Sequence, residues 1–132
     1  MKEFTNIEIA KLFRQVAAVY SITNEKKYKF QIIAYQKAAE VVEKLSAELS
    51  TLFKQQSLDK IPGIGATMQE RLTELFTTGQ VKHYENIMKD VSPAVFPLLD
   101  IPSFGPKKAF RLVTHFKLTD PATIIEIGRA HV

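Results

Sequence analysis

Two short turns, at residues 61–65 and 101–105, constrain the fold of this chain more than any other feature. The first reads Ile-Pro-Gly-Ile-Gly and the second reads Ile-Pro-Ser-Phe-Gly, at a constant offset of forty positions. Proline biases the residue before it away from helical backbone angles, so a preceding helix must end there. Glycine permits a tight turn and leaves room for close approach to the backbone. An apolar-periodic helix follows each turn, so the sequence predicts one supersecondary unit used twice.

The remainder of the chain reads as helices joined by short connections, because no stretch alternates with a period of two residues. Thr5 and Glu8 form a capping box that starts the first helix, which runs to about Ser21. Further helices are expected over about 29–45, after a cap at Ser46, and over 67–78, 82–89, 92–100 and 107–116. The predicted buried stripe of the second helix is Phe30, Ile33, Ala34, Ala38, Val41 and Leu45. The fold class is therefore all-α, a compact multi-helix domain.

The 132 residues divide into two predicted units and a tail. Residues 1–90 form a helical domain with the first turn-and-helix unit at 58–78, and residues 91–125 hold the second. Asp120 and Pro121 have the residue types of an N-cap and a first helical position. Residues 126–132 lack the apolar pattern of that helix and resemble a translated sequencing adapter. We therefore expect the native sequence to depart from this one after about Ile125.

Composition narrows the classes of partner and chemistry. The chain has no cysteine, which excludes disulfides and zinc–thiolate sites. His83 and His115 lack ligand spacing and a carboxylate neighbour, so we expect no metal site at either. No apolar run is long enough to span a bilayer, and the start of the chain is not signal-like. We expect a cytoplasmic monomer with no membrane partner, and the net charge of +4 mildly favours an anionic one.

Each turn opens a helix, and the start of a helix is a ready site for phosphate. Its first N–H groups have no intrahelical acceptor, and the helix dipole is positive at that end. The Ile-Pro-Gly-Ile-Gly pattern is that of the helix-hairpin-helix motif, which resembles a sequence-independent clamp on the DNA backbone. The alternative is a purely structural role, in which both units are helix–helix turns and nothing more.

With two hairpins in order, residues 1 to about 124 resemble the N-terminal region of the X-family, polymerase beta-like DNA polymerases. The matching pieces are Ile-x-Ile-Ala-x-x-Phe at 7–13, Phe-x-x-x-Ala-Tyr-x-x-Ala-Ala at 30–39, the Thr78-Gly79 helix end and both hairpins. The catalytic half of that family would lie beyond residue 132, and Asp90, Asp100 and Asp120 are too isolated to supply its metal site. The resemblance implies non-sequence-specific binding of duplex or gapped DNA, and no polymerase activity by this chain alone.

The resemblance also implies which positions make the contacts. The implied DNA-binding residues are Gly63, Gly65, Ala66, Thr67, Ser103, Gly105, Lys107 and Lys108. No cofactor is required, but a Na⁺ or K⁺ ion is implied at the backbone carbonyls of Asp59, Ile61, Ile64, Leu99, Ile101 and Phe104. Ser103 replaces the first glycine of the second hairpin, where a Cβ is costly if φ is positive. The lysine-rich link of Lys26, Lys27 and Lys29 is interpreted as plain surface.

Two alternative functions stay open. Many relatives act as 5′-deoxyribose-phosphate lyases through a Schiff-base lysine, and alignment through residues 61–65 places Arg71 at that position. Arginine stays protonated and cannot serve as an amine nucleophile, so we expect no lyase activity unless Lys60 substitutes. In the 5′-phosphate pocket of these relatives, Tyr35 is the main residue that matches. At the positions where relatives carry His or Lys, this chain has Phe30, Gln31, Asp59 and Thr67. The third hypothesis is a helical protein-interaction domain.

Overall fold

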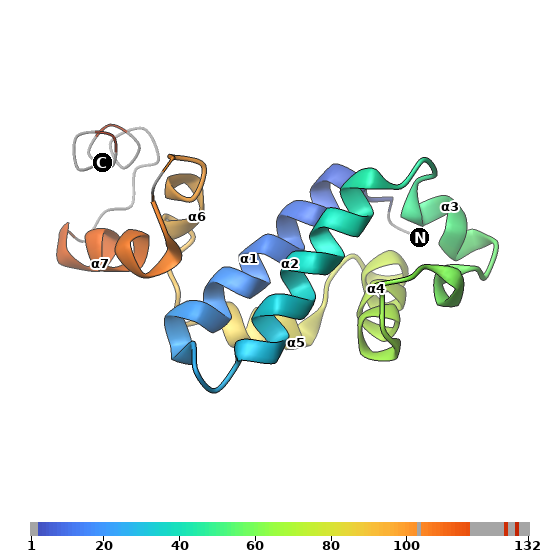
Figure 1. The fold of residues 1–132 in the computed structure, drawn as a ribbon, viewed down its shortest axis with the longest axis horizontal. Coiled ribbons are helices and arrows are strands. Elements are labelled where there is room, and N and C mark those ends of the chain that lie inside the picture. The colour runs from blue at the N-terminus through green and yellow to red at the C-terminus, as the bar shows by residue number, and fades with distance from the viewer. Residues whose placement is uncertain (1–2, 103, 117–125, 127–128, 130–132) are drawn as a thin grey trace.

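The computed structural model describes residues 3–102, 104–116, 126 and 129, and its regular elements are all helical (Figure 1). They are α1 (Asn6–Asn24), α2 (Lys29–Lys44), α3 (Leu49–Lys54), the single 3₁₀ turn η1 (Leu58–Lys60), α4 (Ala66–Thr78), α5 (Lys82–Met88), α6 (Val95–Leu98) and α7 (Pro106–Phe116). No strand occurs in the described part of the chain, and the all-α prediction is confirmed. The predicted helix start at Asp120 lies outside the described residues, and so do most of residues 126–132, the tail that resembles a translated adapter.

The long antiparallel pair of α1 and α2 forms the centre of the molecule (Figure 1). α1 begins at the predicted capping box. The Glu8 N–H donates to Thr5 Oγ1 at 3.1 Å, and the Thr5 N–H donates to Glu8 Oε1 at 3.0 Å. The helix runs past Ser21 to Asn24, because the Ser21 hydroxyl donates to the Ala17 carbonyl one turn back and does not interrupt the helix.

The buried face of α2 differs from the predicted one. The buried residues are Ile32, Tyr35, Ala38, Ala39 and Val42, whereas Phe30 is 82% exposed and Ile33 is 40% exposed. Both stripes have a helical period, and the prediction chose the one with more apolar side chains. The structure instead turns Tyr35 inward, because the Tyr84 hydroxyl pairs with the Tyr35 hydroxyl at 2.9 Å and Phe13 packs against its ring. A buried hydroxyl is stable only with such a partner.

The start of α3 is fixed by a contact from the other end of the chain. The predicted cap at Ser46 is wrong, since the N-cap position is Glu48 and that residue makes no side-chain cap. The buried Asn6 side chain takes this role: it accepts from the Leu49 N–H at 2.7 Å and donates to the Ala47 carbonyl at 2.9 Å. The Glu48 carboxylate in turn accepts from the Asn6 N–H at 2.8 Å. The first turns of α1 and α3 therefore satisfy each other.

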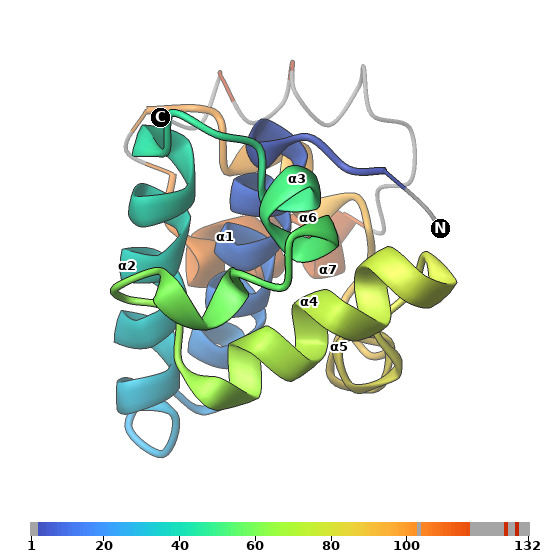
Figure 2. The same ribbon diagram turned by 90° about the vertical axis from the view of Figure 1, so that its right-hand side faces the viewer.

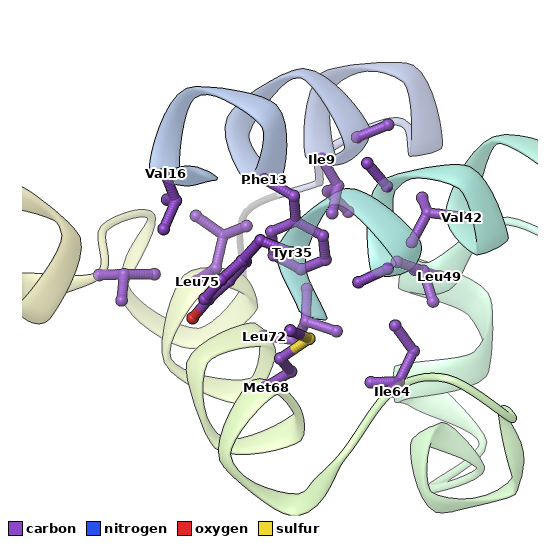
Figure 3. Packing of buried hydrophobic residues seen from close by; sticks show 14 of the residues in the cluster. Ile9, Phe13, Val16, Tyr35, Val42, Leu49, Ile64, Met68, Leu72 and Leu75 are labelled. Carbon is purple, nitrogen blue, oxygen red and sulfur yellow. The ribbon is translucent and has the colours of Figure 1, made fainter. Parts of the chain in front are cut away.

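Two apolar cores share α1. The larger lies where α4 crosses the α1–α2 pair (Figure 2). Figure 3 shows Phe13, Tyr35 and Leu72 pointing into this space. The second core lies at the opposite end of the pair, beside α6 and α7 (Figure 1). Val19 of α1 is completely buried there against residues of the 91–113 segment. Each hairpin is thus supported by its own core.

Candidate nucleic-acid interface

The described residues of the two hairpins form the same backbone hydrogen bonds. In each, the fourth residue of the turn donates its N–H to the carbonyl of the first isoleucine, and the helix begins with a bond back to the last glycine. The first hairpin has Ile64 N to Ile61 O at 3.3 Å and Gln69 N to Gly65 O at 3.0 Å. The second has Phe104 N to Ile101 O at 3.1 Å and Ala109 N to Gly105 O at 3.0 Å. The repeat predicted from the offset of forty is therefore present in the fold, although Ser103 lies outside the described residues.

Gly63 is required by the fold itself. Its φ of +89° lies in the left-handed region, as the turn pattern predicts. A Cβ at this position would lie 2.9 Å from Val41 Cγ2, so the first hairpin rests closely on α2. Both observations explain the glycine without any ligand.

Gly65 and Gly105 have no such structural requirement. Gly65 does not use the conformational freedom of glycine: its backbone is extended, with φ −77° and ψ 175°, because the turn is already complete at Gly63. A Cβ built on Gly65 or Gly105 meets nothing within 4 Å. Gly65 is the N-cap position of α4, and no side chain caps this helix start. The first N–H groups of α4, at Ala66 and Thr67, therefore need an external acceptor.

The structure brings the lysine-rich link and the second hairpin together. Lys107 Nζ lies 3.4 Å from Glu25 Oε1, in an ion pair whose side chains are both more than half exposed. Glu25 belongs to the same connection as Lys26 and Lys27, between α1 and α2. Lys108 Nζ lies 4.8 Å from the centre of the Phe104 ring. Lys26, Lys27 and Lys29 are exposed, as the interpretation of this link as plain surface expects. The ion pair of Glu25 with α7 was not predicted, because no sequence pattern links residues so far apart.

Three of the six predicted cation ligands already accept hydrogen bonds in the hairpins. The carbonyls of Ile61 and Ile101 accept the turn bonds, and the Ile64 carbonyl accepts from Gln69 Nε2 at 3.1 Å. A carbonyl oxygen keeps a second lone pair after one such bond. The monovalent-cation site stays a prediction. In the described segments, no group of three or more His, Asp or Glu side chains is placed to hold a metal ion.

Arg71 lies in a cluster of aromatic hydroxyls that sequence reasoning did not find. The Arg71 charge acts on Tyr20 of α1, on Tyr35 of α2, and on His83 and Tyr84 of α5. Tyr28, in the connection between α1 and α2, joins the cluster through its ring, whose centroid lies 4.7 Å from that of Tyr20. The Tyr20 hydroxyl and His83 Nε2 are 3.2 Å apart. Arg71 Nε is buried and has no hydrogen-bond partner among the described residues. The sequence indicated Tyr35 and Arg71 separately, but the contacts to Tyr20, Tyr84 and His83 come from the tertiary fold.

At neutral pH the charge of this cluster is the Arg71 guanidinium, and the tyrosine hydroxyls are neutral. Burial raises the pKa of Tyr20, Tyr35 and Tyr84 above the usual 10.0. Burial, followed by the Arg71 charge, lowers the pKa of His83, although Glu74 opposes this. The cluster therefore supplies neutral hydroxyls and a guanidinium and no amine nucleophile. Lys60 is exposed on η1 and is not desolvated as a Schiff-base lysine would be.

Alkaline pH is expected to destabilise the fold through the buried tyrosines. Their pKa is higher in the folded state, so the stability is complete below the unfolded pKa of 10.0 and is lost as pH rises above it. Each such tyrosine contributes a slope of about 1.4 kcal/mol per pH unit. Urea unfolding between pH 8 and 11.5 measures this slope. The double variant Tyr35→Phe/Tyr84→Phe should flatten it, and an unchanged slope in that variant would assign the effect elsewhere.

The family of this chain follows from a comparison with known protein families. Residues 4–81 match the model of the "Helix-hairpin-helix domain", which is more than half of the chain. The chain belongs to the helix-hairpin-helix domain family. The family match includes the first hairpin and ends at Val81, so the second hairpin lies outside it.

Two curated DNA polymerases are similar to most of this helix-hairpin-helix protein. DNA polymerase lambda of Arabidopsis thaliana is 27% identical over 108 residues, which cover 81% of this chain and 19% of that protein. DNA polymerase/3′-5′ exonuclease PolX of Bacillus subtilis (strain 168) is 26% identical over 119 residues, covering 90% of this chain and 20% of the relative. The resemblance to X-family polymerases is confirmed, and the chain spans about a fifth of the length of these relatives. None of the helices described could cross a membrane.

Proposed function

We propose that this chain binds DNA through its phosphate backbone, without sequence preference, as the DNA-binding part of an X-family polymerase or repair protein. The observation that carries the proposal is the open space at Gly65 and Gly105, where the fold itself does not require a glycine. Both glycines stand directly before a helix start with the same backbone. The similarity to proteins described as DNA polymerases supports the same assignment.

Backbone donors determine the kind of recognition. The N–H groups at the start of α4, and those expected at the start of α7, are placed to donate to phosphate oxygens, which are the same at every base pair. Lys107 and Lys108 add positive charge at the second hairpin. Contacts of this kind position a protein on DNA and carry no base information. The two hairpins lie at opposite ends of the α1–α2 pair, so a DNA molecule that contacts both must extend along the long axis (Figure 1).

Salt dependence tests this proposal directly. If the two hairpins and nearby lysines neutralise about four phosphates, the logarithm of the binding constant should fall with the logarithm of salt concentration at a slope near −3.6. Fluorescence anisotropy with labelled duplexes of two unrelated sequences measures the slope and the sequence preference together. A slope near zero, or affinities that differ more than tenfold between the sequences, would contradict the proposal. No binding at low salt would favour the protein-interaction alternative.

Lyase activity is expected to be absent. The position that would hold the Schiff-base lysine carries Arg71, and its surroundings contain hydroxyls and an imidazole without an amine. Borohydride trapping on DNA with an incised abasic site is therefore expected to give no covalent adduct. An adduct that disappears in a Lys60→Gln variant would support the lyase alternative instead.

A further inference from the structure

The two hairpins share a backbone hydrogen-bond pattern among their described residues, but their helices carry opposite charge. In the first, α4 carries Glu70 and Glu74 with a single cation, Arg71. In the second, α7 carries two lysines, Arg111 and His115, and it has no acidic residue. Because the backbone is shared, this difference points to a different role for the side chains of the second hairpin.

The cationic side chains of α7 line one face. Lys108, Arg111 and His115 follow at intervals of three and four residues, so they share a side of the helix. Together with Phe104, Leu112 and Phe116 they line a shallow hollow of about 370 Å³. Lys108 lies over the Phe104 ring, and the His115 ring packs edge-on against Phe116 with centroids 4.8 Å apart. The described residues give the hollow an apolar floor and a cationic rim, and none of them that lines it is a carboxylate.

We propose that this face of α7 binds a DNA strand through its side chains and extends the backbone grip of the second hairpin along that strand. The inference rests on the proposed function, since it assumes that the hairpin itself holds DNA. Charge complementarity selects a polyanion, because the ionisable groups that line the hollow within the described part of the chain are Lys108, Arg111 and His115, all of them bases. Phe104 belongs both to the turn and to the hollow, so the two surfaces are continuous.

The dimensions and chemistry of the face fit a nucleic-acid strand. From Lys108 to His115 the helix rises about 10 Å, at 1.5 Å per residue. This length corresponds to about three base-pair steps of 3.4 Å each. The apolar floor of Phe104 and Leu112 suits a deoxyribose ring between two phosphates that contact the rim. The first hairpin then supplies mainly neutral N–H donors, and most of the salt dependence comes from the second.

The inference is tested on the full chain with Arg111→Gln and Lys108→Gln/Arg111→Gln. Glutamine removes the charge and keeps a good helix former. For a labelled duplex, the salt slope should become shallower by about 0.9 in the single variant and about 1.8 in the double variant. At 0.1 M salt the single variant should bind about eightfold more weakly. The matched control is Lys44→Gln, an exposed lysine at the far end of α2 from α7, which should keep the slope and affinity of the parent chain (Figure 1).

The outcomes separate this inference from the proposed function. A parent chain that binds DNA steeply with salt, together with an Arg111→Gln variant of unchanged slope, would overturn the α7 face and leave the hairpin proposal standing. A parent chain that does not bind DNA would remove both. Polyglutamate of equal length is the control for an acidic protein partner. If it binds as tightly as DNA and with the same loss in Arg111→Gln, the face recognises acidic protein and the DNA assignment is wrong. Circular dichroism at 222 nm checks that each variant is folded.

Discussion

Replacing Gly63 with alanine is expected to lower the free energy of unfolding by about 2–3 kcal/mol. The backbone φ of +89° is left-handed, which costs an L-residue about 1–2 kcal/mol. The new methyl group would also lie 2.9 Å from Val41 Cγ2, so α2 or the valine must shift. Both costs act in the folded state, and they add to each other because one concerns the backbone and the other the packing.

Urea unfolding followed by circular dichroism measures this loss. The variant Gly63→Ala/Val41→Ala separates the two costs, since it removes the contact and leaves the backbone strain. Measured against Val41→Ala alone, the Gly63 substitution should then cost only the strain. Gly65→Ala is the matched control elsewhere in the same turn, and it should cost less than about 1 kcal/mol as an N-cap change. A Gly63→Ala variant as stable as the parent chain would contradict the assigned backbone.

Alanine at Gly65 or at Gly105 is expected to have the opposite outcome: a folded protein that binds DNA poorly. A Cβ at either position meets no protein atom, so the fold accepts it. In the proposed DNA complex the same Cβ would occupy the space through which a phosphate reaches the helix N–H groups. Loss of one hydrogen bond to a charged group corresponds to about 1.5–3 kcal/mol, which is about a 10- to 100-fold weaker affinity.

Anisotropy titrations at 50 mM salt, on variants with a melting temperature close to that of the parent, measure this effect. The double variant Gly65→Ala/Gly105→Ala separates two hairpins that act together from one that acts alone. If both contact DNA, the two losses in binding energy add. If only one single variant loses affinity, only that hairpin holds phosphate. Parent-like affinity in the double variant would show that the hairpins are helix–helix turns and nothing more.

The features that the sequence predicted correctly are local ones. The Thr5–Glu8 capping box and the helix end at Gly79, with φ +85°, depend on residues within one or two turns of each other. The repeat of the hairpin is local in the same sense, since each copy spans only a few residues. The start of α3 was not predicted, because the group that caps it is the Asn6 side chain, more than forty positions away.

The candidate site follows the same division. Proline and glycine spacing located both turns, but it did not distinguish Gly63, whose backbone is left-handed, from Gly65, whose backbone is extended. Whether a glycine is needed for its angle or for open space depends on what surrounds it. The cluster around Arg71 was not predictable for a further reason. Tyr35 is turned inward by the hydroxyl of Tyr84, and periodicity alone favoured a neighbouring face of α2 that shares Ala38 with the buried one.

The position of Val19 has a mechanical consequence for the whole molecule. It lies on α1, the helix that supports the first core, yet it is completely buried in the second. The connection between the hairpins is packed as well, since Val91 and Ala94 are buried. One stiff helix, α1, therefore sets the distance between the two hairpins. Lengthening α1 between the cores by one turn should increase the distance between the hairpins by about 5 Å. A DNA molecule that fits the original spacing would then contact only one hairpin.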